Sequence, residues 1–157
     1  MNNVIRFVTA VAVCQLAGLI GSVFTRPAIP GWYAALSKPS FSPPNWVFAP
    51  VWTTLFLLMG IALYLVWTRG LGKAEVRTAM LLFGGQLVLN VLWSVLFFGL
   101  HLPLYAFMEI VVLWVAILLT IIYFWRVTAA AGILLLPYLL WVSFATVLNF
   151  SLWRLNP

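Results

Sequence analysis

The sequence predicts an all-α membrane protein, a bundle of five transmembrane helices that forms one domain over residues 1–157. Three observations predict this fold. Of the 157 residues, 66% are hydrophobic and only 6% are charged, whereas a soluble domain has about 45–50% apolar and about 25% charged residues. Five apolar stretches reach the length of about 20 residues that crosses the hydrocarbon core of a bilayer. Five of the nine prolines lie in one long connection, between the first stretch and the second.

The five apolar stretches are expected to be the membrane spans. The connections after the second, third and fourth spans are short, so these neighbouring helices should run antiparallel. Each of the last four spans has Trp or Tyr near an end, as is typical of residues at a membrane–water interface. The predicted spans are Val4–Phe24, Trp46–Trp67, Thr78–Gly99, Pro103–Trp125 and Gly132–Trp153.

The long connection, Arg26–Asn45, is predicted to be a lid loop between the first and second helices. Its prolines prevent a continuous helix, although Trp32–Ser37 has the length for one or two helical turns. Asn45 is a candidate N-cap for the second helix. A long loop with prolines and aromatic residues in an otherwise minimal protein is a candidate cover for a cavity.

The formal charge of +6 does not indicate nucleic-acid binding, because the basic residues are scattered singly rather than clustered on one face. They are typical of helix-end anchors at anionic headgroups. With five spans, the side of the N-terminus collects five basic residues and the other side three, which favours a cytoplasmic N-terminus with the lid loop and C-terminus outside. The basic residues are Arg6, Arg26, Lys38, Arg69, Lys73, Arg77, Arg126 and Arg154.

Conventional catalytic chemistry is nearly absent from the sequence. One histidine, His101, and one cysteine, Cys14, make no metal cluster, and the single cysteine excludes a disulfide within the chain. The two acids are far apart, and there is no phosphate-binding loop, serine elbow or zinc motif. We therefore expect no metal site and no obligatory cofactor. The unusual feature of the composition is its nine tryptophans, whose flat rings can stack on a ligand and donate an electron to an excited chromophore.

Small residues recur every four positions in the first span, at Ala10, Cys14, Gly18 and Ser22. Such a stripe allows two helices to approach closely in lipid. It predicts either the contact surface of a homodimer or packing against another helix of the same chain. Pro50 and Pro137 lie early in the second and fifth spans, where each is expected to bend its helix.

Polar and aromatic side chains share faces of three predicted helices. The third carries Gln86, Asn90, Trp93 and Phe97 at spacings of four, three and four residues; the second carries Trp52, Phe56 and Met59, and the fifth Tyr138, Trp141, Ala145, Leu148 and Asn149. These faces predict either hydrogen bonds between helices with aromatic packing, or an aromatic-walled pocket with a few amides that orient a flat ligand. Glu109 is either a partly hydrated carboxylate near a helix end or a ligand contact.

Three motifs resemble those of one family. The first is Trp32-Tyr33-x-x-Leu36-x-Lys38-Pro39-x-Phe41-x-Pro43-Pro44-x-Trp46-x-Phe48-x-Pro50-Val51-Trp52. The second is Asn90-x-x-Trp93-Ser94-x-x-Phe97-Phe98. The third is Pro137-Tyr138-x-x-Trp141-x-x-Phe144-Ala145-x-x-Leu148-Asn149. In this order, they resemble the tryptophan-rich sensory protein and mitochondrial translocator protein family (TspO/MBR, also called peripheral benzodiazepine receptors), and the resemblance covers essentially the whole chain.

The resemblance implies a five-helix bundle, commonly dimeric, with a ligand pocket between the helices and under the first loop. Family members bind porphyrins and other tetrapyrroles, sterols and synthetic drugs. The family's sterol motif places a tyrosine where this chain has Phe150. Carried over by position, the pocket residues are Trp32, Trp46, Trp52, Asn90, Trp93, Tyr105, Glu109, Tyr138, Trp141, Ala145 and Leu148.

These observations predict a multi-pass membrane receptor or sensor, in a prokaryotic cell membrane rather than a mitochondrial outer membrane. Protoporphyrin IX or haem would be its ligand, as the resemblance implies, and the lipid bilayer would surround it. The protein would form homodimers, and the candidate contact residues are Ala10, Cys14, Gly18 and Ser22. Two alternatives stay open. One is light-dependent porphyrin degradation, in which Trp52 and Trp141 would be the catalytic residues. The other is transport of sterols, such as cholesterol, or of other lipophilic molecules, gated by the lid loop.

Overall fold

The computed structural model describes residues 2–157, and no strand occurs among them. Five helical segments are long and apolar enough to cross a membrane, which confirms the predicted bundle. The elements are α1 (Asn3–Ala28), a π-helical turn (Ile29–Tyr33), a 3₁₀ turn (Asn45–Val47), α2 (Phe48–Trp67), α3 (Ala74–Ser94), a π-helical turn (Val95–Gly99), α4 (Pro103–Val127), α5 (Ala129–Leu134) and α6 (Leu136–Leu155).

The first helix is longer than its apolar stretch predicts. It does not end at Phe24 but continues through Pro27 to Ala28 and then through the π-helical turn to Tyr33. A proline removes one N–H donor, and local π-helical adjustment with packing against neighbouring helices accommodates the loss inside a membrane bundle. The short helix expected at Trp32–Ser37 is therefore the end of this first span. The irregular part of the lid loop is correspondingly shorter, between residues 36 and 44.

The structure agrees with only part of what the sequence predicts for Asn45, Pro50 and Pro137. Asn45 is not an N-cap: it is the first residue of a 3₁₀ turn that Pro44 precedes, without a side-chain cap. Pro50 falls in the first turn of α2, where an N–H has no acceptor within the helix to lose, and a bend of α2 at this residue stays a prediction. Pro137 has the predicted effect, since the fifth span is broken between α5 and α6 immediately before it.

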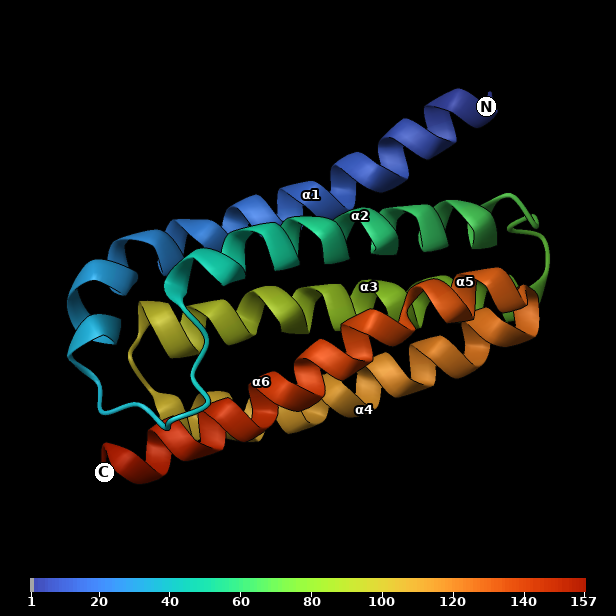
Figure 1. The fold of residues 1–157 in the computed structure, drawn as a ribbon. Helices are drawn as coiled ribbons and strands as arrows, with labels where there is room; N and C mark the ends of the chain where they lie inside the picture. Colours follow the sequence, from blue (N-terminus) through green and yellow to red (C-terminus); the bar gives the residue numbers. More distant parts are fainter. Residues whose placement is uncertain (1) are drawn as a thin grey trace.

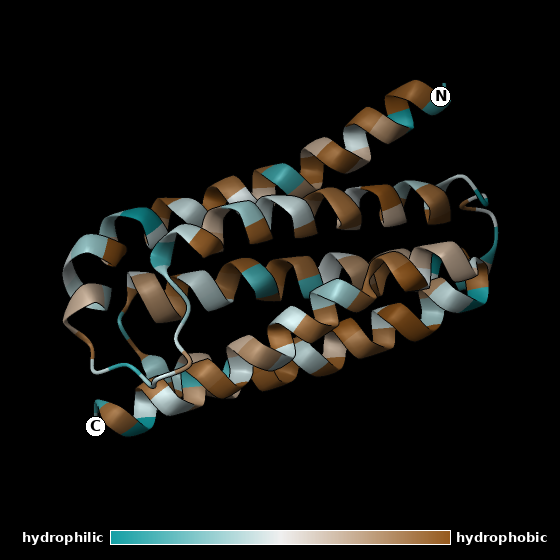
Figure 2. Ribbon diagram, in the orientation of Figure 1, coloured by the Kyte–Doolittle hydropathy of each residue, from teal (hydrophilic) through white to brown (hydrophobic). Residues whose placement is uncertain are grey.

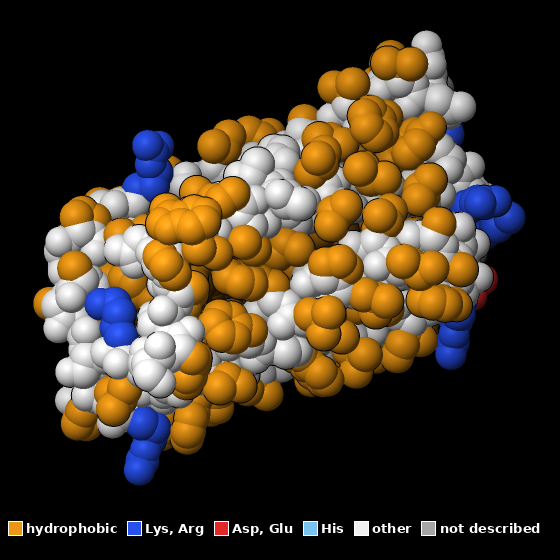
Figure 3. Space-filling view, viewed as in Figure 1, with side chains coloured by type: hydrophobic (Ala, Val, Ile, Leu, Met, Phe, Trp, Pro, Cys, Tyr) orange, Lys and Arg blue, Asp and Glu red, His pale blue; other side chains and the backbone are white. Residues whose placement is uncertain are grey.

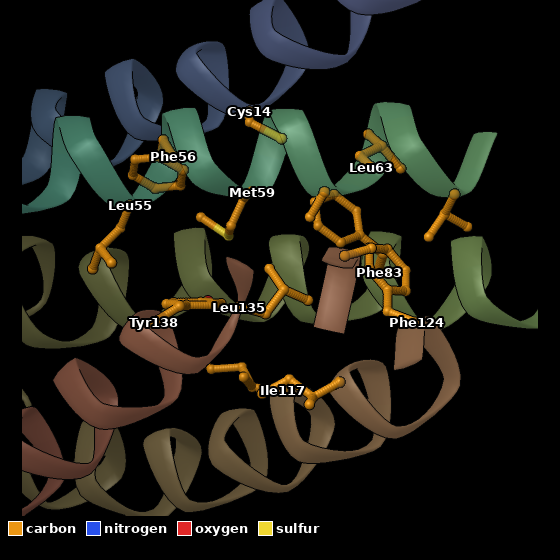
Figure 4. Packing of buried hydrophobic residues seen from close by; sticks show 14 of the residues in the cluster. Cys14, Leu55, Phe56, Met59, Leu63, Phe83, Ile117, Phe124, Leu135 and Tyr138 are labelled. Atoms are coloured by element: carbon orange, nitrogen blue, oxygen red, sulfur yellow. The ribbon is translucent and has the colours of Figure 1, made fainter. Parts of the chain in front are cut away.

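Figure 1 shows α1 and α2 side by side, with the lid loop returning past the C-terminal end of α6. The core between the helices is aromatic and aliphatic, and it includes Phe83 stacked on Phe124 at 5.4 Å between ring centroids. Figure 4 shows this packing, with Cys14 directed from α1 toward α2. Hydrophobic residues predominate along the helices (Figure 2), and on the face seen in Figure 3 apolar side chains cover the middle of the molecule while Lys and Arg lie at its two ends. This distribution is that of a protein in a bilayer.

The small residues of α1 allow close packing within this chain. Ala10 and Cys14 are fully buried. A Cβ on Gly60 of α2 would lie 2.7 Å from the Cα of Val11, so the two backbones touch where the glycine has no side chain. Of the two interpretations of the stripe, packing inside the chain is therefore observed for Ala10 and Cys14. Homodimerisation stays a prediction.

Candidate ligand cavities beneath the lid loop

Two cavities lie in the half of the bundle nearest the lid loop. The larger, here called the α1–α2 cavity, has a volume of about 420 Å³ and is bordered by residues of α1, α2 and α3 that include Gln15, Ser22, Thr53 and Ser94. The smaller, here called the aromatic cavity, has a volume of about 20 Å³ and lies between α2, α3 and α6. Four aromatic residues border both and form a shared wall: Phe48, Trp52, Trp93 and Phe98.

Trp52 and Trp141 lie on different helices and border the same aromatic cavity, together with Ala145 and Leu148. The Trp52 ring packs edge-on against Tyr138, with centroids 6.3 Å apart, and the Trp141 ring packs edge-on against Phe48 at 6.2 Å. The indole Nε1 of Trp141 is buried and has no hydrogen-bond acceptor within residues 2–157. An indole N–H usually finds a partner when it is buried, and this donor lacks one.

The amide side chains form a network across three helices. The Asn90 Nδ2 donates to the Tyr138 hydroxyl at 2.8 Å, and that hydroxyl donates to Gln86 Oε1 at 2.8 Å. The indole Nε1 of Trp93 donates to Asn149 Oδ1 at 3.0 Å, and Asn149 Nδ2 donates to the Pro103 carbonyl at 2.8 Å. Hydrogen bonding between helices is therefore observed as predicted, and the aromatic faces next to the network border cavities. The binding of a flat ligand at these faces stays a prediction.

Six predicted pocket residues border one or both cavities: Trp52, Asn90, Trp93, Trp141, Ala145 and Leu148. The other five border neither. Trp46 and Tyr105 face outward, with 74% and 59% of their surface exposed, and Tyr138 is fully buried in the network. Trp32 stacks on His101 at 4.3 Å and closes the bundle at its loop end. For all of them, ligand contact stays a prediction.

Glu109 is the fifth predicted pocket residue that borders neither cavity. The sequence left two interpretations of it, a partly hydrated carboxylate or a ligand contact, and its surroundings do not fit the first. The side chain is buried, and neither carboxylate oxygen has a hydrogen-bond partner within residues 2–157. The expectation of a partly hydrated carboxylate near a helix end is therefore wrong, because both carboxylate oxygens are buried. An unpaired carboxylate inside a bundle is unfavourable. Its contact with a ligand stays a prediction.

Sequence reasoning missed residues that complete the cavity walls. Phe48 and Phe98 border both cavities, and Tyr33 closes the aromatic cavity from the end of the first span. All three occur in the quoted motifs, yet nothing in their spacing distinguished them from packing residues. Gln15 and Ser22 were the available signal on α1, since polar groups in an apolar span tend to face the bundle interior.

The C-terminal Asn156 holds the lid loop in place. Its Oδ1 accepts from the backbone N–H of Ser37 and its Nδ2 donates to the Ser37 carbonyl, both at 2.9 Å. This pair of bonds joins segments that are 119 residues apart in the sequence. The ammonium group of Lys38, next along the loop, lies 4.8 Å above the Tyr33 ring, which ties the loop to a wall residue of the aromatic cavity.

Replacing Asn156 with alanine should loosen this attachment. The Ser37 amide then loses its acceptor, and at about 1 kcal/mol for a hydrogen bond of this kind its exchange with deuterium should accelerate about fivefold. Hydrogen exchange measured by mass spectrometry on peptides covering residues 34–44 reports the change. Asn2→Ala, at the opposite end of the molecule, is the control. Equal exchange in Asn156→Ala and the native protein would show that the pair does not hold the loop.

The fold and its cavities define a class: an integral membrane protein of five spans whose aromatic cavities lie under an anchored loop. Residues 10–154 match the TspO/MBR family, and the chain belongs to this family, as the three motifs predict.

Similar proteins span bacteria and animals. The chain is 46% identical over 156 residues to the "Tryptophan-rich protein TspO" of Chlorobaculum tepidum, which covers 99% of each chain. It is 40% identical over 143 residues to the human "Translocator protein", covering 90% of this chain and 85% of the human one. It is 34% identical over 151 residues to the "Tryptophan-rich sensory protein" of Cereibacter sphaeroides, covering 96% and 90%.

Proposed function

We propose that this protein is a membrane receptor that binds tetrapyrroles such as protoporphyrin IX or haem between its helices. The observation that carries the proposal is the convergence of Trp52 and Trp141, from separate helices, on one cavity with an unpartnered indole N–H. Flat π-systems stack favourably on indole faces. Relatives whose names describe a sensory and a translocator protein support a role in recognising a molecule in the membrane.

The volumes of the two cavities support one placement of the tetrapyrrole in this proposal. At about 20 Å³, the aromatic cavity holds no more than a single water. The adjoining α1–α2 cavity, at about 420 Å³, lies within the range of about 300–1,000 Å³ that is usual for ligand pockets. The ring system therefore enters the α1–α2 cavity and stacks on the shared wall. Rotation of Trp52 joins the two spaces and exposes the face of Trp141 to the ligand.

Replacing Trp52 and Trp141 together with phenylalanine should weaken protoporphyrin IX binding about tenfold. An aromatic pair contributes about 0.5–1.5 kcal/mol beyond area burial, and the smaller ring loses part of that at each of two positions. Because the two tryptophans are themselves emitters, affinity is best read in detergent from the porphyrin Soret band and not only from fluorescence quenching. Trp125→Phe is the matched control, because Trp125 is exposed on α4 and borders neither cavity. An unchanged affinity in the double variant would remove both tryptophans from the site.

Light-dependent degradation of porphyrin is the second candidate, favoured by the position of Trp52 and Trp141 on one cavity. In that reaction an excited porphyrin takes an electron from a neighbouring indole, and dioxygen is the oxidant. Absorbance of illuminated and dark samples, with and without protein, separates degradation from passive binding. Bleaching at the same rate without protein would leave only the receptor function.

We also propose that the protein lies in a prokaryotic cell membrane with its N-terminus in the cytoplasm. Relatives from a bacterium and from the archaeon Archaeoglobus fulgidus, the latter 43% identical over 155 residues, support this membrane. The charge difference between the two sides supports the orientation.

A further inference from the structure

We propose that a chain of aromatic rings carries electrons between the shared wall of the two cavities and the solvent at the loop end of the bundle. The chain begins at Trp93 in the wall and leaves the protein at Trp32, beside His101. Through it, an electron that a light-excited guest removes from Trp93 is replaced from outside. The inference rests on the proposed function, since it takes the guest to be a photoactive tetrapyrrole, and it adds a path by which the wall is reduced again.

Each ring of this path contacts the next. The Trp93 ring stacks on Phe97, with centroids 5.2 Å apart and planes inclined by 15°. The Trp32 ring packs edge-on against the same Phe97 ring at 5.4 Å. Trp32 in turn stacks on His101 at 4.3 Å, with planes inclined by 11°. A single phenyl ring therefore separates the two indoles, and the path ends at an exposed imidazole.

The surroundings of the two indoles set the direction in which a positive charge moves. Trp93 borders both cavities, so a guest in either one covers it with an apolar ring. Trp32 is half-buried and lies against the exposed His101. A charge costs far less free energy near water than in an apolar interior. An indole radical cation is therefore more stable at Trp32, and Phe97, which is much harder to oxidise, is only the bridge between the two indoles.

Tyr33 is the other oxidisable ring beside Phe97, at 6.4 Å between centroids, and it is a poor exit for the charge. The ammonium group of Lys38 lies 4.8 Å above the Tyr33 ring. A positive charge so near opposes a second one on the ring. Oxidation of a phenol also releases its proton, and the Tyr33 hydroxyl is buried away from water. The path therefore runs through Trp32.

The transfer is balanced in electrons and protons. The excited porphyrin takes one electron from Trp93, which leaves a porphyrin radical anion and an indole radical cation, and dioxygen takes the electron from the anion to become superoxide. The Trp93 Nε1–H donates to the amide oxygen of Asn149 at 3.0 Å. An amide is too weak a base to remove this proton, so one electron from Trp32 restores Trp93. Trp32 then loses its N–H proton to water, and a water-soluble one-electron donor of the ascorbate type returns an electron and a proton to it.

The test follows the tryptophan radical by transient absorption after a laser flash, with protoporphyrin IX bound to the protein in detergent. Under argon, methyl viologen takes the place of dioxygen as electron acceptor, so that singlet oxygen cannot oxidise the indoles directly. In the native protein, the decay of the radical should accelerate in proportion to the ascorbate concentration. Trp32→Phe keeps an aromatic ring but has no oxidisable indole, so the radical should stay on Trp93 and its decay should lose the dependence on ascorbate.

Trp125→Phe is the matched control, because Trp125 is exposed on α4 and borders neither cavity. It should keep the ascorbate dependence of the native protein. The Soret band of each sample reports porphyrin binding separately. Bound porphyrin that gives no tryptophan radical, or a radical whose decay depends on ascorbate equally in the native protein and in Trp32→Phe, would overturn the path and leave the receptor function intact. Failure of porphyrin to bind the native protein would instead remove the proposed function and this inference with it.

Discussion

Replacing Gly60 with alanine should lower the stability of the bundle by about 2 kcal/mol, the usual cost of forcing an extra group into a packed interior. The added Cβ would lie 2.7 Å from the Cα and 3.2 Å from the backbone N of Val11. Backbone atoms cannot rotate out of the way as a side chain can, so α1 and α2 must move apart. This separation loosens the buried packing of Ala10 and Cys14 as well.

Thermal unfolding in detergent, followed by circular dichroism, measures the effect. At about 2–4 °C per kcal/mol for a chain of this size, the midpoint should fall by about 4–8 °C. Gly84→Ala is the matched control, since a Cβ at Gly84 meets nothing within 4 Å. Alanine there should be neutral or stabilising by up to about 1 kcal/mol, because it favours the helix. Equal midpoints for the two variants would show that the helices have room to adjust.

Replacing Tyr138 with phenylalanine should destabilise the protein by about 1–3 kcal/mol. The hydroxyl is both acceptor for Asn90 and donor to Gln86, and its loss leaves two buried amide groups without these partners. Hydrogen bonds between membrane helices average about 0.6 kcal/mol, which favours the lower part of the range. Because Asn90 also borders the α1–α2 cavity, the released amide changes the polarity of the ligand site.

The comparison with Tyr105→Phe isolates the network. Tyr105 loses the same hydroxyl at an outward-facing position, so its unfolding midpoint should match that of the native protein. A triple variant with Tyr138→Phe, Gln86→Leu and Asn90→Leu removes all three polar partners and should recover part of the loss, because apolar replacement of a whole network leaves no unpaired group. A Tyr138→Phe variant as stable as Tyr105→Phe would show that water or other groups replace the hydroxyl.

The sequence predicted the spans because each is a long apolar run whose ends carry aromatic or basic residues, and lipid imposes that pattern strongly. The extension of the first helix past Pro27 was not predictable in this way. A proline in an isolated helix interior is a reliable stop, whereas in a bundle the neighbours and a π-helical turn compensate for the missing bond. The position of Tyr33 in a cavity wall depends on that extension.

The residues of the candidate site were also predictable in part from the sequence. Helical spacing placed Asn90 and Trp93 on one face of the third helix and Trp141 and Leu148 on one face of the fifth, and the motif resemblance implied that these residues line a pocket. The division of the space into two cavities was not predictable, because it depends on the rotamers of Trp52 and Phe48 and on how closely α1 approaches α2. The two hydrogen bonds between Asn156 and Ser37 were likewise not predictable, because no sequence pattern indicates which residue a polar side chain after the last helix will contact.

The shared wall makes the two cavities interdependent. Because Phe48, Trp52, Trp93 and Phe98 face both spaces, a shift of these rings that widens one side takes room from the other. A small guest that widens the α1–α2 cavity by moving these rings would therefore narrow the aromatic cavity further, while a single broad guest that displaces the partition would occupy both spaces. Small and broad compounds should accordingly differ in how strongly they change the surroundings of Trp141, which borders only the aromatic cavity.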